Sequence, residues 1–246
     1  MTSPASTLVL FDIDGTILLT AGAGRRAITA ALVAEIGPTT AFEGVRFDGK
    51  TDPQIVAEML QVAGDRRAGD PVFIRGLCRR YLAFLADELQ DERTRTTILP
   101  GIPGLMDALE QRLDVVLGLL TGNFAEGAAL KLAAAGIAPE RFRVGAYGSD
   151  SAHRPDLPAI AARRAMEHFG REPQGREIVI IGDTPADVTC GRSLRARTIG
   201  VATGSYPVDA LQAAGADHVF PDLSDTPRVL EAILDGAATA PSGMEP

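Results

Sequence analysis

Apolar residues follow two spacings along the chain, and the order of these spacings predicts the fold. A short continuous apolar run at Thr7–Phe11 ends in acidic residues, as buried strands do. From about residue 24 to residue 92 the apolar residues recur at helical spacing in three stretches. Asp52 and Pro53 are interpreted as the N-cap and first-turn proline of the second stretch. This region therefore predicts three helices.

After Pro100 the chain alternates between apolar runs and helical spacings. The expected strands lie at residues 115–120, 142–147, 178–181, 198–201 and 219–220, and the expected helices at about 105–113, before 136, and at 157–169, 188–194, 208–213 and 228–234. Continuous apolar strands that alternate with helices indicate a parallel sheet covered on both faces.

We therefore predict an α/β fold: a doubly wound, Rossmann-like parallel sheet core with an inserted helical cap domain. Residues 1–19 and 96–235 are expected to form the core, and residues 20–95 the cap. Residues 236–246 are small, polar and rich in Pro and Gly, so they are expected to be a disordered tail.

Composition narrows the possible partners. The formal net charge of −8 and the aromatic share of 5%, with no Trp, argue against a nucleic acid or an anionic membrane. The apolar runs are shorter than the roughly 18 residues of a membrane span. Two cysteines, Cys78 and Cys190, do not suffice for a disulfide framework, and Met1–Thr7 has no basic signal region. We expect a cytoplasmic protein that is either a monomer or a homodimer.

Polar residues gather where the predicted strands end. Asp12–Thr16 follows the strand at 7–11, and Thr121–Asn123 follows the strand at 115–120. Asp183–Asp187 follows the strand at 178–181, and Arg154 lies after the strand at 142–147. Ligands of a doubly wound sheet bind beyond the carboxyl ends of its strands. These side chains are therefore expected at one edge of the sheet.

The acids among them point to a metal ion. Asp12 and Asp14 would share one face of an extended strand and repel each other, which a divalent cation relieves. An Asp-Gly turn is the competing interpretation, and Asp183 at a second strand end favours the metal. Thr121 and Gly122 offer a hydroxyl and an N–H group to an anion, although a simple helix cap also fits these residues.

Three segments resemble the motifs of the haloacid dehalogenase superfamily. Val9–Thr16 resembles its first motif, Leu119–Asn123 its second and Ile180–Asp187 its fourth, in the family's order. The resemblance covers about residues 7–234. The helical insert is similar to the cap of the phosphoglycolate phosphatase-like branch.

The resemblance implies roles for these residues. Asp12 would be the nucleophile, which forms an aspartyl-phosphate, and Asp14 the general acid and base. Mg²⁺ would be held by Asp12, the main-chain carbonyl of Asp14, and Asp183. Asp187 would lie behind the metal and orient its waters or the cation of motif three.

The same resemblance implies how the substrate binds. Thr121 and Gly122 would bind phosphate oxygens, and Asn123 beside them is a candidate substrate contact. Motif three departs from the family, because its usual Lys is replaced by Arg154, which keeps the charge. In the cap, Lys50 and Thr51 lie in a segment that selects substrate in this branch, although an ordinary capped turn explains them too.

The predicted function is a Mg²⁺-dependent phosphatase that hydrolyses a small phosphorylated metabolite, with phosphoglycolate as the best single guess. A phosphomutase of the β-phosphoglucomutase type would use the same acids. A haloacid dehalogenase is disfavoured by Asp14, because that chemistry uses no acid two residues after its nucleophile. A non-catalytic phosphate-binding protein is disfavoured because Asp12, Asp14 and Asp183 are all present.

Overall fold

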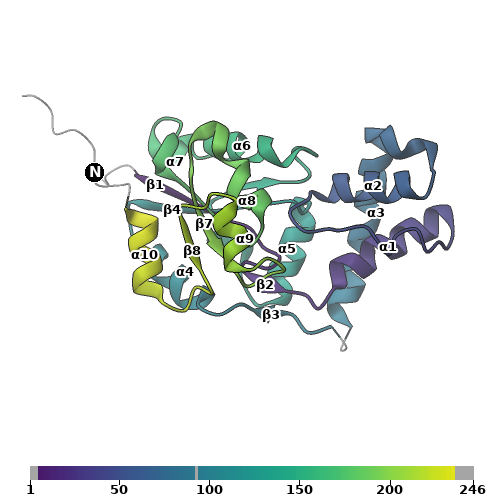
Figure 1. Cartoon of the computed structure of the whole chain (residues 1–246), viewed down its shortest axis with the longest axis horizontal. Coiled ribbons are helices and arrows are strands. Elements are labelled where there is room, and N and C mark those ends of the chain that lie inside the picture. The colour runs from purple at the N-terminus through teal and green to yellow at the C-terminus, as the bar shows by residue number, and fades with distance from the viewer. Residues whose placement is uncertain (1–4, 92–93, 236–246) are drawn as a thin grey trace, which may run out of the picture.

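A six-stranded parallel sheet forms the centre of the molecule in a computed structural model, which describes residues 5–91 and 94–235 (Figure 1). Its strand order is β5-β4-β1-β6-β7-β8. The strands are β1 (Thr7–Phe11), β4 (Val115–Thr121), β5 (Val144–Tyr147), β6 (Ile178–Gly182), β7 (Arg197–Val201) and β8 (His218–Phe220). The predicted α/β class with a doubly wound parallel sheet is confirmed.

The central strand β1 shows why the sheet needs helices on both faces. Leu8 and Leu10 pack into the apolar core on one face, whereas Val9 and Phe11 pack into the core on the other. All four side chains are fully buried, since successive residues of a strand point to opposite faces. A continuous apolar run thus needs two covering layers.

Helices supply these two layers. The face of Val9 is covered by α4 (Ile102–Glu110), α5 (Ala125–Ala134) and α10 (Thr226–Leu234). The other face is covered by α6 (Leu157–Arg164), α7 (Met166–Phe169) and α8 (Pro185–Cys190). Helix α9 (Val208–Ala213) contacts β7, β8 and α8. None of the helices in the described residues is long and apolar enough to cross a membrane.

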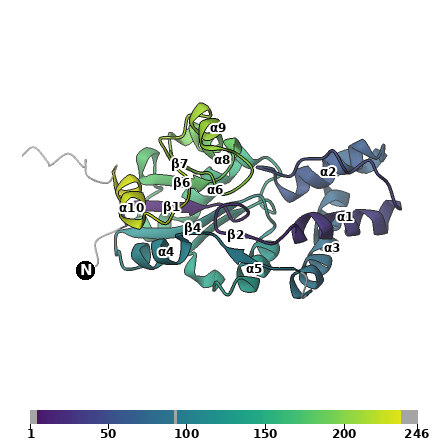
Figure 2. The same ribbon diagram turned by 60° about the horizontal axis from the view of Figure 1, so that its bottom comes forward.

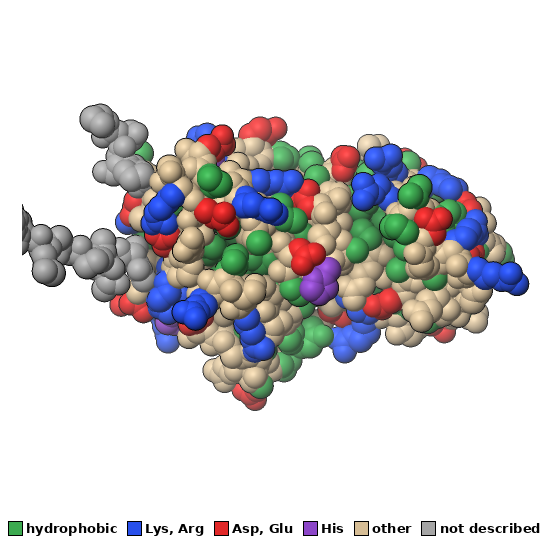
Figure 3. Space-filling model, turned by 90° about the horizontal axis from the view of Figure 1, so that it is seen from above, with side chains coloured by type: hydrophobic (Ala, Val, Ile, Leu, Met, Phe, Trp, Pro, Cys, Tyr) green, Lys and Arg blue, Asp and Glu red, His purple; other side chains and the backbone are tan. Residues whose placement is uncertain are grey.

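Three further helices form a lobe beyond the carboxyl edge of the sheet (Figures 1 and 2). They are α1 (Ala23–Ile36), α2 (Asp52–Val62) and α3 (Pro71–Gln90), which share an apolar core of their own. We call them the cap. The chain enters and leaves it through a short antiparallel ribbon of β2 (Leu18–Leu19) and β3 (Thr97–Ile98), which the sequence pattern does not predict. On the face of the molecule that Figure 3 shows, acidic and basic side chains are intermixed over both lobes.

Some predicted element boundaries are wrong. The N-cap of α2 is Thr51 and not Asp52, because the Thr51 hydroxyl accepts the N–H of Gln54. Helix α8 begins near Pro185 because Thr184 and Asp187 form a reciprocal capping box. The helix expected at 157–169 is divided into α6 and α7, and the strand expected at 142 begins at 144. The predicted tail lies outside the described residues.

Backbone contacts join the cap to the core. The Asp52 N–H donates to the Gly122 carbonyl at 2.8 Å, and the Thr51 hydroxyl donates to the Ala152 carbonyl at 2.7 Å. A side chain at Gly122 would collide with the Lys50 carbonyl, so this approach requires glycine. The cap loop therefore lies directly on the loop that follows β4.

Asp52 is the buried carboxylate at this contact. One of its oxygens accepts from the Tyr81 hydroxyl and from the Phe124 N–H, both at 2.8 Å. Burial raises the pKa of Asp52 to about 6, although Lys131 and these two donors oppose the rise. The ionised form is therefore costly in the folded state.

This cost predicts that Asp52→Asn stabilises the protein at neutral pH. Because the pKa is raised on folding, the stability linked to Asp52 is present near pH 4 and is lost as pH rises through about 6. An amide oxygen can accept both hydrogen bonds. The unfolding free energy of the variant, relative to wild type, should increase by roughly 2–3 kcal/mol between pH 4 and 7 in urea titrations. The exposed Asp209→Asn variant is the control, and equal pH profiles for all three proteins would contradict the assignment.

Candidate active site

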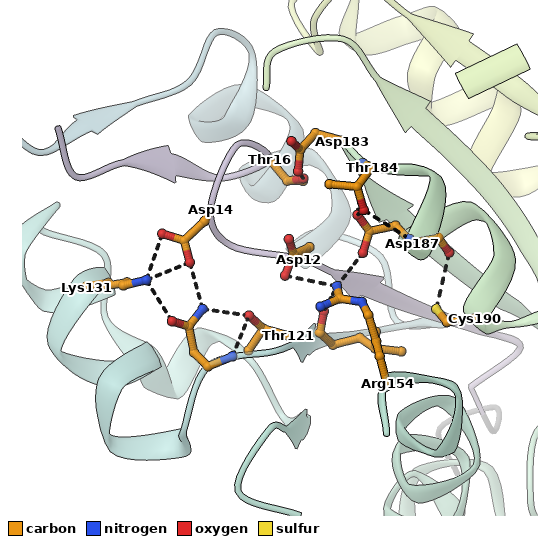
Figure 4. A network of polar contacts seen from close by, with 12 residues as sticks. Asp12, Asp14, Thr16, Thr121, Lys131, Arg154, Asp183, Thr184, Asp187 and Cys190 are labelled. Carbon is orange, nitrogen blue, oxygen red and sulfur yellow. Dashed lines mark hydrogen bonds and ion pairs between the residues drawn. The ribbon is translucent and has the colours of Figure 1, made fainter. Parts of the chain in front are cut away.

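One cavity of about 360 Å³ lies between the carboxyl edge of the sheet and the cap. The sequence-predicted residues that line it are Asp12, Asp14, Lys50, Thr121, Gly122, Asn123, Arg154 and Asp183. Four of these side chains, from three strand ends and one 3-10 turn, converge in Figure 4: Asp12, Thr121, Arg154 and Asp183. The expectation of a shared edge holds for these residues.

The conformation of the loop after β1 depends on its contacts with β6 and with Asp183. The Asp12 N–H donates to the Ile181 carbonyl at 2.9 Å, so the β1–β6 pairing continues to the first acid. Gly15 has a φ of 87°, a left-handed conformation that other residues rarely adopt. A side chain there would also collide with Asp183. Gly15 thus lets the fourth-motif carboxylate approach the first-motif loop.

Three carboxylates share a small buried space. Ligand oxygens of Asp12, Asp183 and Asp187 lie within 4.8 Å of one another, and all three residues are buried. Burial raises the pKa of Asp12, and Arg154 opposes this rise. Burial raises the pKa of Asp183 as well, and Asp187 and Asp12 add to the effect. Hard oxygen donors in such a group suit a divalent cation such as Mg²⁺, so these residues fit the metal that the motifs imply.

Arg154 is the cation that contacts this cluster. It forms an ion pair with Asp187 and lies 3.3 Å from an oxygen of Asp12. The residue is buried, and its Nε has no hydrogen-bond partner among the described residues. Thr184 donates its hydroxyl and N–H to the other oxygen of Asp187. Of the two roles expected for Asp187, orientation of the motif-three cation is the one these contacts support.

Asp14 faces away from the three-carboxylate cluster. Its oxygens accept from Lys131 Nζ at 2.7 and 2.8 Å and from Asn123 Nδ2 at 2.8 Å. Asn123 Nδ2 also donates to the Thr121 hydroxyl oxygen at 2.8 Å. Asn123, expected to contact substrate, therefore links two other predicted site residues.

Lys131 is a residue of this site that the sequence motifs do not indicate. It lies on α5, outside the three motif segments. A local signal was present, because Lys131 is a lone charge in the apolar stretch 128–135. Such a residue must be exposed or paired.

The two cap residues have different surroundings. Lys50 lines the cavity and forms an ion pair with Glu58 on α2. Thr51 is fully buried, and its hydroxyl is occupied by the Ala152 carbonyl and the Gln54 N–H. Thr51 is not among the residues that line the cavity, so the structure does not bring it to the site.

Comparison with known families identifies the chain. A model of the family described as haloacid dehalogenase-like hydrolase matches residues 9–192. The chain belongs to this family. The matched span contains the three motif segments and the cap, and the resemblance seen in the sequence is confirmed. No curated protein matches the chain.

Several solved structures share the fold of this chain. A hydrolase from Pseudomonas syringae is 21% identical, with a TM-score of 0.67 over 92% of this chain and 97% of that one. A predicted phosphoglycolate phosphatase from Haemophilus somnus is 16% identical, with a TM-score of 0.67 over 92% and 98%. CbbY from Rhodobacter sphaeroides, in complex with xylulose-1,5-bisphosphate, is 20% identical, with a TM-score of 0.68 over 89% and 95%.

The buried ion pairs predict that Arg154→Met lowers the unfolding free energy by about 3 kcal/mol or more, because Asp187 would keep an uncompensated buried charge. In the Asp187→Asn background the same change should cost much less, because the charge is gone. Denaturant titrations of the two single variants and the double variant measure this coupling. Equal costs in both backgrounds would contradict the pairing.

Proposed function

We propose that this haloacid dehalogenase-like hydrolase is a Mg²⁺-dependent phosphatase that hydrolyses a small phosphomonoester through an aspartyl-phosphate. The observation that carries this proposal is the position of Asp12. Its carboxylate lines the cavity within the cluster of Asp183 and Asp187 and lies beside Arg154. A nucleophile, a place for a cation and a fixed guanidinium thus surround one point.

The first step follows from these neighbours. An Asp12 oxygen attacks phosphorus, a new P–O bond forms, and the bond to the leaving alcohol breaks. The Thr121 hydroxyl and the Gly122 N–H bind the phosphoryl oxygens, and the Arg154 guanidinium contributes fixed positive charge. Asp12 and Asp183, with the carbonyl of Asp14, would hold Mg²⁺, which when bound neutralises charge on the phosphate.

Asp14 supplies the protons for both steps. Its carboxyl group gives a proton to the departing alcohol oxygen and then takes one from the water that attacks the aspartyl-phosphate. The products are the alcohol and inorganic phosphate, and Asp12 is restored. The side chain of Asp14 is 43% exposed, so it is accessible to both the leaving group and water.

The cavity favours a small substrate. Its volume of about 360 Å³ is at the lower end for ligand sites. Lys50 and Arg25 from the cap line it together with the core residues. Cations from the cap in the same cavity as the phosphate site suit a second anionic group, such as a carboxylate close to the phosphate. Phosphoglycolate has this chemistry, and the similar structure from Haemophilus somnus carries a matching name.

Two other activities, those of a phosphomutase and of a dehalogenase, can be distinguished from a phosphatase by their products. A similar structure, 16% identical with a TM-score of 0.64, is named a putative β-phosphoglucomutase from Bacteroides vulgatus. A mutase would convert a sugar phosphate into its isomer, whereas a phosphatase releases inorganic phosphate. A dehalogenase would release halide from a 2-haloacid without a metal. Assays of phosphate, isomer and halide, with Mg²⁺ and with chelator, decide among them.

If Asp12 is the nucleophile, Asp12→Asn should abolish turnover, because an amide does not attack phosphorus at a useful rate. Wild-type protein mixed with substrate and quenched with hydroxylamine should show modification at Asp12 by mass spectrometry, and the variant should not. Circular dichroism should be the same for both, since the two side chains have nearly equal volume. The exposed Asp107→Asn variant is the control. Substantial activity in Asp12→Asn would refute the covalent mechanism.

The raised pKa values of Asp12 and Asp183 predict that protons compete with the metal. Below these pKa values the buried carboxyls hold protons that Mg²⁺ must displace, so the affinity for Mg²⁺ should rise with pH. The expected slope is about tenfold per pH unit for each proton released. Calorimetric titrations of the protein between about pH 6 and pH 8 measure it. Asp183→Asn should bind weakly and with a smaller slope, and a pH-independent affinity would contradict the prediction.

A further inference from the structure

Lys131 is a buried cation at the edge of the cavity to which no motif assigns a role. Its side chain is 6% exposed, on a helix whose neighbouring positions are apolar. Burying an ammonium group is costly unless each of its donors finds a partner. The contacts of Lys131 therefore indicate what it does.

All three N–H groups of Lys131 are occupied by core side chains (Figure 4). Two donate to the two carboxylate oxygens of Asp14, at 2.7 and 2.8 Å, and the third donates to Asn123 Oδ1 at 2.7 Å. Asn123 Nδ2 closes the ring by donating to Asp14 at 2.8 Å. The Asp14 carboxylate is thus held from two sides.

The exposures of the two partners differ. Asp14 is 43% exposed at its side chain, whereas Lys131 is almost completely covered. A substrate in the cavity can therefore reach the carboxylate but finds no free donor on the ammonium group. This arrangement suits a residue that supports Asp14 from behind, and it disfavours direct binding of the substrate phosphate by Lys131.

The cap lies against this arrangement. A side-chain carbon at Gly24 on α1 would lie 3.4 Å from Lys131 Nζ and 3.7 Å from Cε, at ordinary van der Waals distance, so α1 closely approaches the lysine side chain. On the same helix α5, Gly127 lies against Tyr81 of α3. The helix that carries Lys131 thus packs against the cap, and the position of the ammonium group is fixed by both lobes.

We propose that Lys131 is a positioning residue that, with Asn123, fixes the Asp14 carboxylate for proton transfer to the leaving group. This proposal rests on the proposed phosphatase function. Without the ammonium group Asp14 would rotate in water, and fewer of its orientations would reach the leaving oxygen. The loss should therefore fall on turnover, while binding of the phosphate, which other residues contact, should change little.

A kinetic double-mutant cycle with Mg²⁺ and an alkyl phosphate tests this role. Lys131→Met should lower kcat roughly 10- to 100-fold, a usual effect of losing such a supporting contact, and should change KM much less. In the Asp14→Asn background the same substitution should have almost no effect, because Lys131 would act through Asp14. Arg141→Met, which removes a cation from the far surface, is the matched control. A general structural role would instead lower kcat equally in both backgrounds.

Chemical rescue provides a second measurement. Lys131→Ala leaves a space beside Asp14. Where Asp14 is unchanged, methylammonium added to the assay should recover part of the turnover that Lys131→Ala loses. It should recover nothing in the Asp14→Asn background. A wild-type-like Lys131→Met, equal losses in both backgrounds, or no rescue by methylammonium would each overturn the proposal.

The outcomes also separate this proposal from the proposed function. If wild type releases no phosphate from any ester, the phosphatase assignment fails. If wild type is active and Asp14→Asn is impaired while Lys131→Met is not, the assignment stands and only the role of Lys131 is wrong.

Discussion

The crowding of three carboxylates into one buried space is the constraint on which the rest of the site depends. Asp12, Asp183 and Asp187 have oxygens within 4.8 Å of one another, and burial leaves little water to solvate them. Arg154 contacts two of the three and supplies permanent positive charge. Guanidinium does not lose its proton in proteins, so Arg154 keeps its positive charge beside the cluster at any working pH.

The same crowding explains why the site suits a divalent cation. Burial raises the pKa of Asp12 and of Asp183, so both resist ionisation while no further positive charge is near. A cation favours the ionised carboxylates that the proposed nucleophile and the proposed metal ligands need. In the proposed mechanism, charge neutralisation by Arg154 and by the cation would keep Asp12 ionised for attack on phosphorus.

Asp12 and Asp14 are two residues apart, yet they occupy different environments. Asp12 is buried among other acids, whereas Asp14 is half exposed and held by Lys131 and Asn123. Two carboxyl groups of one loop can take different roles when their environments differ. The arrangement agrees with the proposed roles of Asp12 as the nucleophile and Asp14 as the general acid and base.

The sequence by itself determined the parts of this protein that depend on local pattern. Apolar runs and helical spacings located the strands and helices, and the rule that parallel strands end at one edge brought together Asp12, Thr121 and Asp183. Arg154 also followed from its place after a strand. These inferences succeed because they need no knowledge of how distant segments pack.

Only the tertiary structure decided the contacts between segments that are far apart in the chain. Asp14 and Lys131 are 117 residues apart, so no local spacing pairs them. Thr51 was expected at the substrate. Because the cap packs against the core, its hydroxyl instead donates a hydrogen bond to the Ala152 carbonyl. Asp52 was expected as a helix cap and became a buried acceptor at the same contact. Burial and partners at such an interface depend on how two lobes meet, which one-dimensional periodicity does not encode.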